Sequence, residues 1–411
     1  MFNIKKTVLM LMAIMVGCIA LYAAPALAHG EKSQAAYLRM RTLLWYDVEV
    51  STTKLQVNDE MTMTGKFYWF YDWPSNIAKP EVAFLNIGIP GPVFIRKASY
   101  INGVSGTNST RFEIGETYEF KVILKARRAA RVHMHALMNV KEAGPLIGPG
   151  RWVEVTGDMA DFTNEVTTLT GETVDLETYG LANAVKWHIF WGVIAAAWLL
   201  YWIFQGPILI PRYKKVKLLN EDADDIITPA NRMVGLVLLI GTMAVVTWSY
   251  YHAHSQYPVT IPLQSGQITI PALPDAARGV NVEMVDARYR VPGRSLEFTI
   301  KVTNNTNSPI RPGEFTSANV RWMNPDVSKA EPADSHDPVA SNGMTYEGGA
   351  VMPGQTKLLK VACTDAAWET YRLAKLIYDP DSRFGGLLFF FDEEGNRSVV
   401  ALGGPLLPVF I

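Results

Sequence analysis

Cysteine is almost absent from this sequence. Only Cys18 and Cys363 occur among 411 residues, so one chain cannot build a zinc or iron–sulfur site on thiolates, or a disulfide-rich scaffold. An excess of one charge is missing as well, since 38 basic side chains are balanced by 39 acidic ones. Nucleic-acid-binding domains usually carry a basic surface, and this balance gives no electrostatic reason to expect nucleic acid as a partner.

Charged residues of either sign are scarce, at 19% of the chain, whereas 49% of the residues are hydrophobic. Globular domains typically contain about 25% charged residues. The composition therefore suits a soluble protein that also carries a few membrane spans, and the length allows two or three domains with cores of their own. With 31 glycines and 24 prolines, frequent turns and many short strands are expected.

Residues 1–28 have the pattern of an export signal. Lys5 and Lys6 precede an apolar run over 8–22, and the small residues at 26–28 form an Ala-x-Ala cleavage site. An uncleaved membrane anchor is the alternative interpretation. Cleavage after Ala28 would remove Cys18 and make His29 the amino-terminal residue of the mature chain.

Two long apolar runs, 185–204 and 233–251, predict membrane-spanning helices. Each has about the twenty residues needed to cross ~30 Å of hydrocarbon, and buried helices of a soluble domain are the alternative. The loop between them, 205–232, contains five basic residues: Arg212, Lys214, Lys215, Lys217 and Arg232. The positive-inside rule places this loop in the cytoplasm. Both flanking segments would then lie outside, in agreement with an export signal.

The two flanking segments, 29–184 and 252–411, each predict an antiparallel β-domain. Short runs rich in β-branched and aromatic residues alternate with turn residues, as over 61–70, 82–86, 118–124 and 296–303. This spacing is typical of a sandwich or barrel. The stretch 365–378 differs, because its apolar residues recur every three or four positions and predict a short helix. We therefore expect a mainly β protein with two similar domains joined by two transmembrane helices.

Two of the seven histidines, His133 and His135, are spaced to bind one metal ion. At positions i and i+2 of a strand, both imidazoles project from the same face. A processed amino terminus at His29 would add a third imidazole and an α-amine with a pKa near ~8, low enough for a metal ion to displace its proton. The Irving–Williams order favours copper(II) in such a nitrogen-rich site. The alternatives are a hydrogen-bonded pair of surface histidines and an accidental histidine beside the cleavage site.

The other histidines are weaker candidates. His188, His252 and His254 lie near the outer ends of the predicted spans, where histidine is usually an interfacial polar group. A cluster that contacts a partner subunit is the alternative. A blue-copper site needs two histidines and a cysteine, but the second β-domain carries only His336 and Cys363. We therefore expect that domain to hold no metal.

Motifs throughout the mature chain match one family. They are His29-Gly-Glu, Trp45-Tyr-Asp47, His133-Met-His135, Gly148-Pro-Gly150, Val291-Pro-Gly-Arg294 and Asp379-Pro-Asp-Ser-Arg-Phe384. Together they resemble the B-type subunit of the copper membrane monooxygenases, which include particulate methane monooxygenase and ammonia monooxygenase. The resemblance implies two periplasmic cupredoxin-like domains joined by two transmembrane helices, and a copper site made by His29, His133 and His135. It also implies two membrane subunits of the A and C type as partners, assembled as a trimer of protomers in the lipid bilayer of a bacterial inner or intracytoplasmic membrane.

The activity implied by the resemblance is hydroxylation of methane to methanol, or of ammonia to hydroxylamine, with O₂. Some members have a histidine at the position of Leu44 that completes a separate bis-histidine site, so this second site is not expected here. The resemblance leaves open whether the oxidising copper lies in this chain or in the membrane subunits. Two other functions remain open: a membrane-anchored periplasmic protein for copper delivery or storage, and a structural scaffold subunit.

Overall fold

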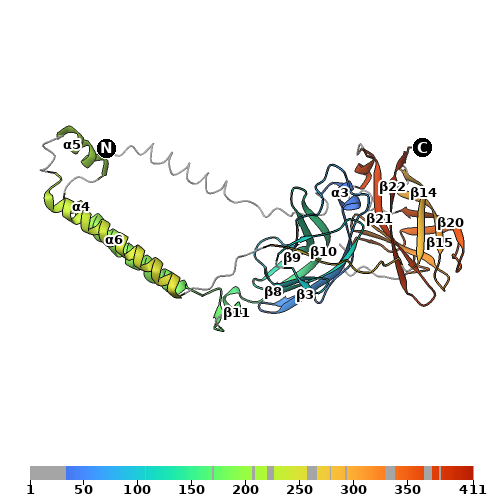
Figure 1. Cartoon of the computed structure of the whole chain (residues 1–411), viewed down its shortest axis with the longest axis horizontal. Helices are drawn as coiled ribbons and strands as arrows, with labels where there is room; N and C mark the ends of the chain where they lie inside the picture. Colours follow the sequence, from blue (N-terminus) through green and yellow to red (C-terminus); the bar gives the residue numbers. More distant parts are fainter. Residues whose placement is uncertain are drawn as a thin grey trace, which may run out of the picture. The chain divides into compact units, whose positions relative to one another are not determined.

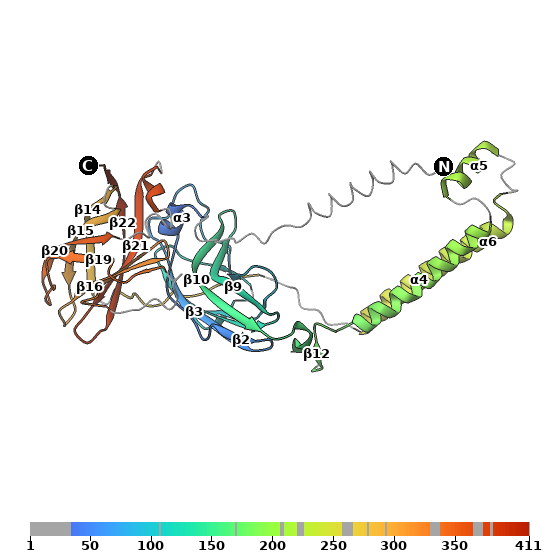
Figure 2. The ribbon, with the colours of Figure 1, turned by 180° about the vertical axis from the view of Figure 1, so that it is seen from behind.

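The computed structural model describes residues 34–106, 108–168, 171–205, 209–219, 226–256, 266–277, 279–291, 294–328, 338–364, 373–378 and 381–410. The predicted export signal, its cleavage site and His29 lie outside the described residues. The chain divides into two compact units, which are described separately (Figures 1 and 2). One unit combines residues up to 162 with those from 264 onward and holds both β-domains, and the other covers 163–263.

Two sheets form the first β-domain, with strand orders β1-β3-β8-β5-β6 and β13-β7-β4-β9-β10-β2. Their bounds are β1 (Leu43–Val50), β2 (Lys54–Gln56), β3 (Glu60–Trp69), β4 (Ala83–Gly88), β5 (Phe94–Ile101), β6 (Val104–Ser105), β7 (Ser109–Arg111), β8 (Thr117–Ala126), β9 (Ala130–Val140), β10 (Gly144–Thr156) and β13 (Gln267–Thr269). Side chains from both sheets, such as Phe67 and Met134, meet in one apolar core. A short 3₁₀ turn, η1 (Met159–Asp161), follows β10.

The first domain takes one edge strand from the far end of the chain. β13 comes after both long helices, yet it pairs in parallel with β7, Gln267 opposite Ser109. The sequence assigned residues 252–411 to the second domain, and nothing in it indicated this pairing. A strand of three residues is too short to show an alternating hydrophobic pattern in the sequence. An edge strand can also join a sheet through backbone hydrogen bonds alone.

Two five-stranded sheets form the second β-domain, with orders β19-β20-β15-β14-β23 and β18-β17-β16-β21-β22. Their bounds are β14 (Val280–Arg290), β15 (Ser295–Asn304), β16 (Arg311–Ser317), β17 (Val320–Met323), β18 (Val339–Ala340), β19 (Met344–Glu347), β20 (Thr356–Thr364), β21 (Arg383–Phe391), β22 (Arg397–Pro405) and β23 (Leu407–Val409). Cys363 lies inside this core, where burial raises the pKa of its thiol. Of the predicted helix over 365–378, the structure describes only a 3₁₀ helix, η3 (Leu373–Tyr378).

The predicted fold class is confirmed. The predicted strands over 61–70, 82–86, 118–124 and 296–303 fall in β3, β4, β8 and β15. Pairing within the β-domains is antiparallel except at edges, where β2, β13, β18 and β23 pair in parallel.

A short helix links the start of the described chain to the second domain. This helix, α3 (Ala36–Arg41), buries Ala36 and Met40 in the core of the second domain before β1 enters the first. A Cβ at Gly385 would lie 2.6 Å from the carbonyl oxygen of Met40, so this close approach requires glycine. Figures 1 and 2 both show α3 between β21 and the β9–β10 hairpin. α3 is therefore anchored in the core of the second domain and lies between the two β-domains.

Apolar contacts and ion pairs join the two β-domains. Leu44, Tyr46 and Phe70 pack against Leu387 and Phe389 in a buried cluster, which accounts for the apolar residue at 44. Burial in this region raises the pKa of Tyr46 to about 12, so its hydroxyl stays neutral at physiological pH.

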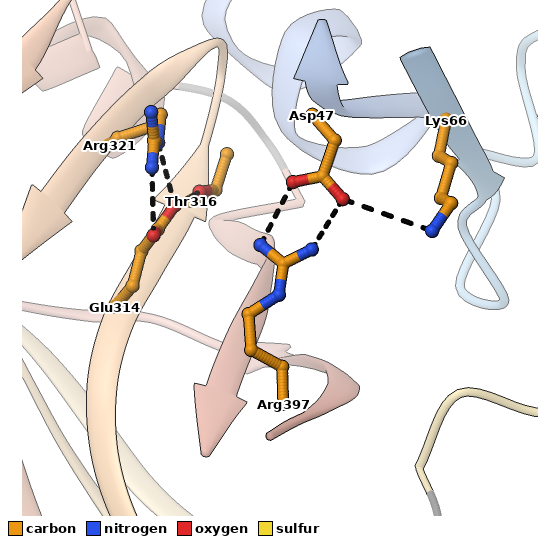
Figure 3. Close-up of polar contacts among 6 residues, drawn as sticks. All are labelled: Asp47, Lys66, Glu314, Thr316, Arg321 and Arg397. Carbon is orange, nitrogen blue, oxygen red and sulfur yellow. Dashed lines mark hydrogen bonds and ion pairs between the residues drawn. The ribbon is translucent and has the colours of Figure 1, made fainter. Parts of the chain in front are cut away.

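Asp47 and Arg397 form a two-pronged ion pair across the domain boundary (Figure 3). Arg397 Nη1 donates to Asp47 Oδ1 at 2.9 Å, and Lys66 Nζ lies 4.0 Å from the same carboxylate. The hydrogen bonds that Arg397 donates to Asp47 raise the pKa of the Arg397 guanidinium. Asp47 adopts a φ of +52°, which is uncommon for a residue other than glycine. Its backbone is therefore held in place by its contacts.

The described residues of the other unit form a β-hairpin and three helices. They are β11 (Glu165–Thr167), β12 (Thr173–Asp175), α4 (Leu181–Phe204), α5 (Leu209–Leu219) and α6 (Pro229–Gln256). With 24 and 28 residues, α4 and α6 are long and apolar enough to cross a membrane. They run side by side (Figures 1 and 2), and the Tyr201 hydroxyl donates to Asn231 Oδ1 at 2.6 Å between them. Four of the predicted loop cations, Arg212, Lys214, Lys215 and Lys217, lie on α5.

Replacement of Arg397 by Ala should destabilise the contact between the β-domains. The change leaves the Asp47 carboxylate, 29% exposed, without its main partner, and such losses cost about 1–3 kcal/mol. We expect a lower melting temperature for the detergent-solubilised chain.

Lys301→Ala is the matched control, because Lys301 and Glu283 form an exposed pair (51% and 72%) of a kind that contributes roughly 0–1 kcal/mol. Equal effects of the two changes would contradict a structural role for the Asp47–Arg397 pair.

Candidate metal centre

The structure brings His133 and His135 together on one face of β9. The alternate residues Val132, Met134 and Ala136 enter the core, so the two histidines project from the opposite face, as the i, i+2 spacing predicted. Their ring centroids are 4.6 Å apart at an interplanar angle of 84°. His133 Nδ1 lies 3.0 Å from His135 Nε2. The third predicted ligand, His29, lies outside the described residues.

A glycine on the neighbouring strand makes room for these rings. In the β9–β10 register, Gly150 stands opposite His135. A Cβ at Gly150 would lie 2.5 Å from His133 Cε1 and 2.6 Å from His135 Cε1. No side chain fits there without displacing an imidazole. The register also shifts between Ile147 and Gly150, so the Gly-Pro-Gly segment forms a bulge beside the histidine pair.

One hydrogen bond determines the tautomer of His135. His135 Nδ1 lies 3.1 Å from the carbonyl oxygen of Gly148. Because a carbonyl only accepts, His135 Nδ1 carries the hydrogen, and Nε2 then accepts from the Nδ1–H of His133 at 3.0 Å. A metal-binding histidine commonly donates its other N–H in this way, which fixes the tautomer and the ring orientation. His133 in turn packs against Trp152, with centroids 5.0 Å apart.

The separation of the two nitrogens suits neighbouring positions around one metal ion. With metal–nitrogen bonds of ~2.0 Å, a separation of 3.0 Å corresponds to an angle of roughly 95° at the metal. Copper(II) prefers tetragonal or square-planar coordination, in which neighbouring ligands are ~90° apart. Two imidazoles do not complete such a set, and no group of three or more His, Cys, Asp or Glu in the described part of the chain could hold a metal ion.

The segment that leads back to His29 is fastened beside this pair. Gln34 Nε2 donates to the carbonyl of Pro145 at 2.6 Å, and the N–H of Ile147 donates to Gln34 Oε1 at 3.2 Å. Four residues lie between His29 and Gln34, and the five Cα–Cα steps of an extended chain span up to ~17 Å. This span is the longest distance at which His29 can lie from Gln34. Sequence reasoning did not single out Gln34, because a side-chain amide that bonds to the backbone has no characteristic spacing.

The remaining described histidines do not gather into a second site. His188 Nδ1 lies 2.7 Å from the Ala184 carbonyl on its own helix. His252 stacks on Trp248, and His254 on Tyr250, within α6. His336 lies outside the described residues.

Gly150→Ala should impair metal binding without removing a ligand, because the added methyl group displaces at least one imidazole. We expect a large loss of bound copper(II) in an equilibrium titration. Gly404→Ala is the matched control, since its Cβ would meet Met284 Cγ at an ordinary 3.5 Å. Unchanged copper binding by Gly150→Ala would show that the two rings do not form the site.

Comparisons with known proteins assign the chain to a family. The model of the family of monooxygenase B-type subunit proteins matches residues 30–410. A protein of Methylococcus capsulatus (strain Bath) named "Particulate methane monooxygenase alpha subunit" is 48% identical over 398 residues, which cover 96% of this chain and 95% of that protein.

Solved structures match only weakly. The cupredoxin domain of amoB from Nitrosocaldus yellowstonii is 15% identical with a TM-score of 0.25, and the match covers 32% of this chain and 98% of that domain. The N-terminal periplasmic domain of ScsB from Proteus mirabilis is 9% identical with a TM-score of 0.20, and the match covers 87% of this chain and 92% of that one. On the strength of the sequence matches, the chain belongs to the family of monooxygenase B-type subunits and is one component of a multi-subunit monooxygenase.

Proposed function

We propose that this chain is the copper-holding subunit of a membrane monooxygenase, with His29, His133 and His135 as the copper ligands. The observation that carries the proposal is the pair of ring nitrogens 3.0 Å apart, in a space that Gly150 leaves open. Family membership supports the activity, and the nitrogen donors support copper over harder ions such as Mg²⁺ or Ca²⁺.

The described residues have distinct parts in this site. His133 offers Nδ1 and His135 offers Nε2, while the Gly148 carbonyl holds the ring of His135 in place. Bound copper would supply the one-electron and O₂ chemistry that protein side chains lack. The proposed substrate is methane, which is converted to methanol, or ammonia, which is converted to hydroxylamine. One oxygen atom of O₂ enters the product, and the other leaves as water after uptake of two electrons and two protons from a reductant.

We also propose that membrane subunits of the A and C type are the partners, in a trimer of three-subunit protomers. Within the single chain, the apolar side chains along α4 and α6 are largely exposed, so lipid and neighbouring helices are their expected surroundings. Lys214, Lys215 and Lys217 on α5 support a cytoplasmic position for the segment between the spans. Both β-domains would then lie in the periplasm.

The orientation can be tested with a protease. Applied to the outer face of sealed spheroplasts, it should cleave the β-domains but leave the segment 205–232 intact, because that segment faces the cytoplasm. Immunoblots against each segment provide the readout, and inverted vesicles are the control. Cleavage of 205–232 from outside would overturn the proposed topology.

The copper assignment is tested by changing His133 and His135 together to Ala. We expect the complex to lose the copper of this site and the thermal stabilisation that copper confers, because metal binding stabilises the folded state. The melting temperatures of the copper-free proteins should be equal. His252→Ala/His254→Ala removes two histidines at the same spacing on α6 and should retain the copper.

Oxidation of methane and ammonia by the same complexes shows what the site does. Activity that falls in step with copper supports a site that is catalytic or supplies the catalyst. Activity that persists without this copper would contradict a catalytic role and favour a scaffold function. Copper at the wild-type level in the double variant would contradict the ligand assignment.

A further inference from the structure

We propose that Gln34 and Asn319 are positioning residues for the metal site, and that Asn319 makes the second β-domain part of its support. Both side chains bond to the backbone of Ile147, which directly precedes the Gly-Pro-Gly bulge. The inference rests on the proposed function, because it takes His133 and His135 as ligands.

Side-chain amides hold both backbone groups of Ile147. Its N–H donates to Gln34 Oε1 at 3.2 Å, and its carbonyl accepts from Asn319 Nδ2 at 2.9 Å. On its open side, β10 has β2 as a neighbour only over 154–156. At 145–147 no strand in the described part of the chain therefore satisfies the outward-facing N–H and C=O groups of this edge. Gln34 and Asn319 take the place of that strand.

The held segment is next to the group that orients His135. One residue beyond Ile147, the carbonyl of Gly148 accepts the N–H of His135. Gly148 is closely packed as well, because a Cβ there would lie 3.0 Å from the Trp45 ring and 3.1 Å from the Ala136 carbonyl. The two amides therefore hold the residue before Gly148 along the strand edge that β2 does not cover.

The two positioning residues come from different parts of the chain. Gln34 belongs to the segment before α3, whereas Asn319 lies in the two-residue turn between β16 and β17 of the second domain. Arg39, itself buried, connects them: its Nε donates to the Gln34 carbonyl at 3.2 Å and its Nη1 reaches the Ala318 carbonyl at 3.5 Å.

The backbone of this turn indicates that its contacts determine its shape. Ala318 and Asn319 have φ values of +50° and +69°. Two left-handed residues are what a two-residue hairpin requires, and glycine or asparagine is normally preferred there. An alanine in this conformation is strained, and such strain persists only where the surroundings fix it. The turn is buried, with Ala318 fully covered and Asn319 only 6% exposed.

The test is a competitive copper(II) titration of the purified full-length chain, with the electron paramagnetic resonance spectrum recorded for each variant. Gln34→Met keeps the shape of the side chain without its hydrogen bonds, and Asn319→Gly removes the amide while glycine still accepts the positive φ. Loss of a residue that orients a ligand typically weakens metal binding 10–100-fold. We expect each single variant to show this loss of copper affinity and a changed spectrum. The double variant should lose less affinity than the product of the two separate losses.

Gln267→Met is the matched control. Gln267 lies on β13, at the far edge of the same sheet, and its side-chain amide donates to the Glu81 carbonyl. Its replacement should leave the copper affinity and the spectrum unchanged. If Gln34→Met and Asn319→Gly bind copper like this control while His133→Ala/His135→Ala does not bind it, the positioning role is wrong and the ligand assignment stands. If His133→Ala/His135→Ala binds copper like the wild type, the proposed function fails first.

Discussion

The structure around the candidate metal site depends on the absence of a side chain at Gly150. Only an open position there allows the rings of His133 and His135 to lie with nitrogens 3.0 Å apart on one strand. The bulge that carries Gly150 also brings the Gly148 carbonyl to His135 Nδ1, so Nε2 is the nitrogen of that ring that faces His133. The chemistry proposed for the chain therefore begins with a backbone feature rather than with an unusual side chain.

Two β-domains are needed to keep that feature in place. The second domain buries α3, which connects the amino-terminal segment to β1, and its β16–β17 turn reaches Ile147 beside the bulge. The Asp47–Arg397 pair and the apolar cluster around Phe389 hold the two domains together. A domain that carries no predicted metal ligands of its own can thus support the metal site of its neighbour.

Residue patterns predicted much of this fold and part of the site. Alternating runs located β3, β8 and β15, and the two apolar runs fall within α4 and α6. The i, i+2 spacing correctly placed His133 and His135 on one face. Three features carried no such pattern. β13 is too short to show a hydrophobic alternation. α3 buries two arginines and therefore has no ordinary apolar stripe. Gln34 acts through hydrogen bonds to the backbone, which leave no spacing pattern in the sequence.

The central claim is a copper site that includes the amino group of His29. Its most direct test compares copper(II) bound to the mature chain, with its first residue established by mass spectrometry, and copper(II) bound to a chain that carries one extra alanine before His29. The extension converts the amine into a peptide amide. An amine ligand predicts weaker binding and a changed electron paramagnetic resonance spectrum for the extended chain. Identical affinity and spectrum, or a mature chain that begins elsewhere, would contradict the claim.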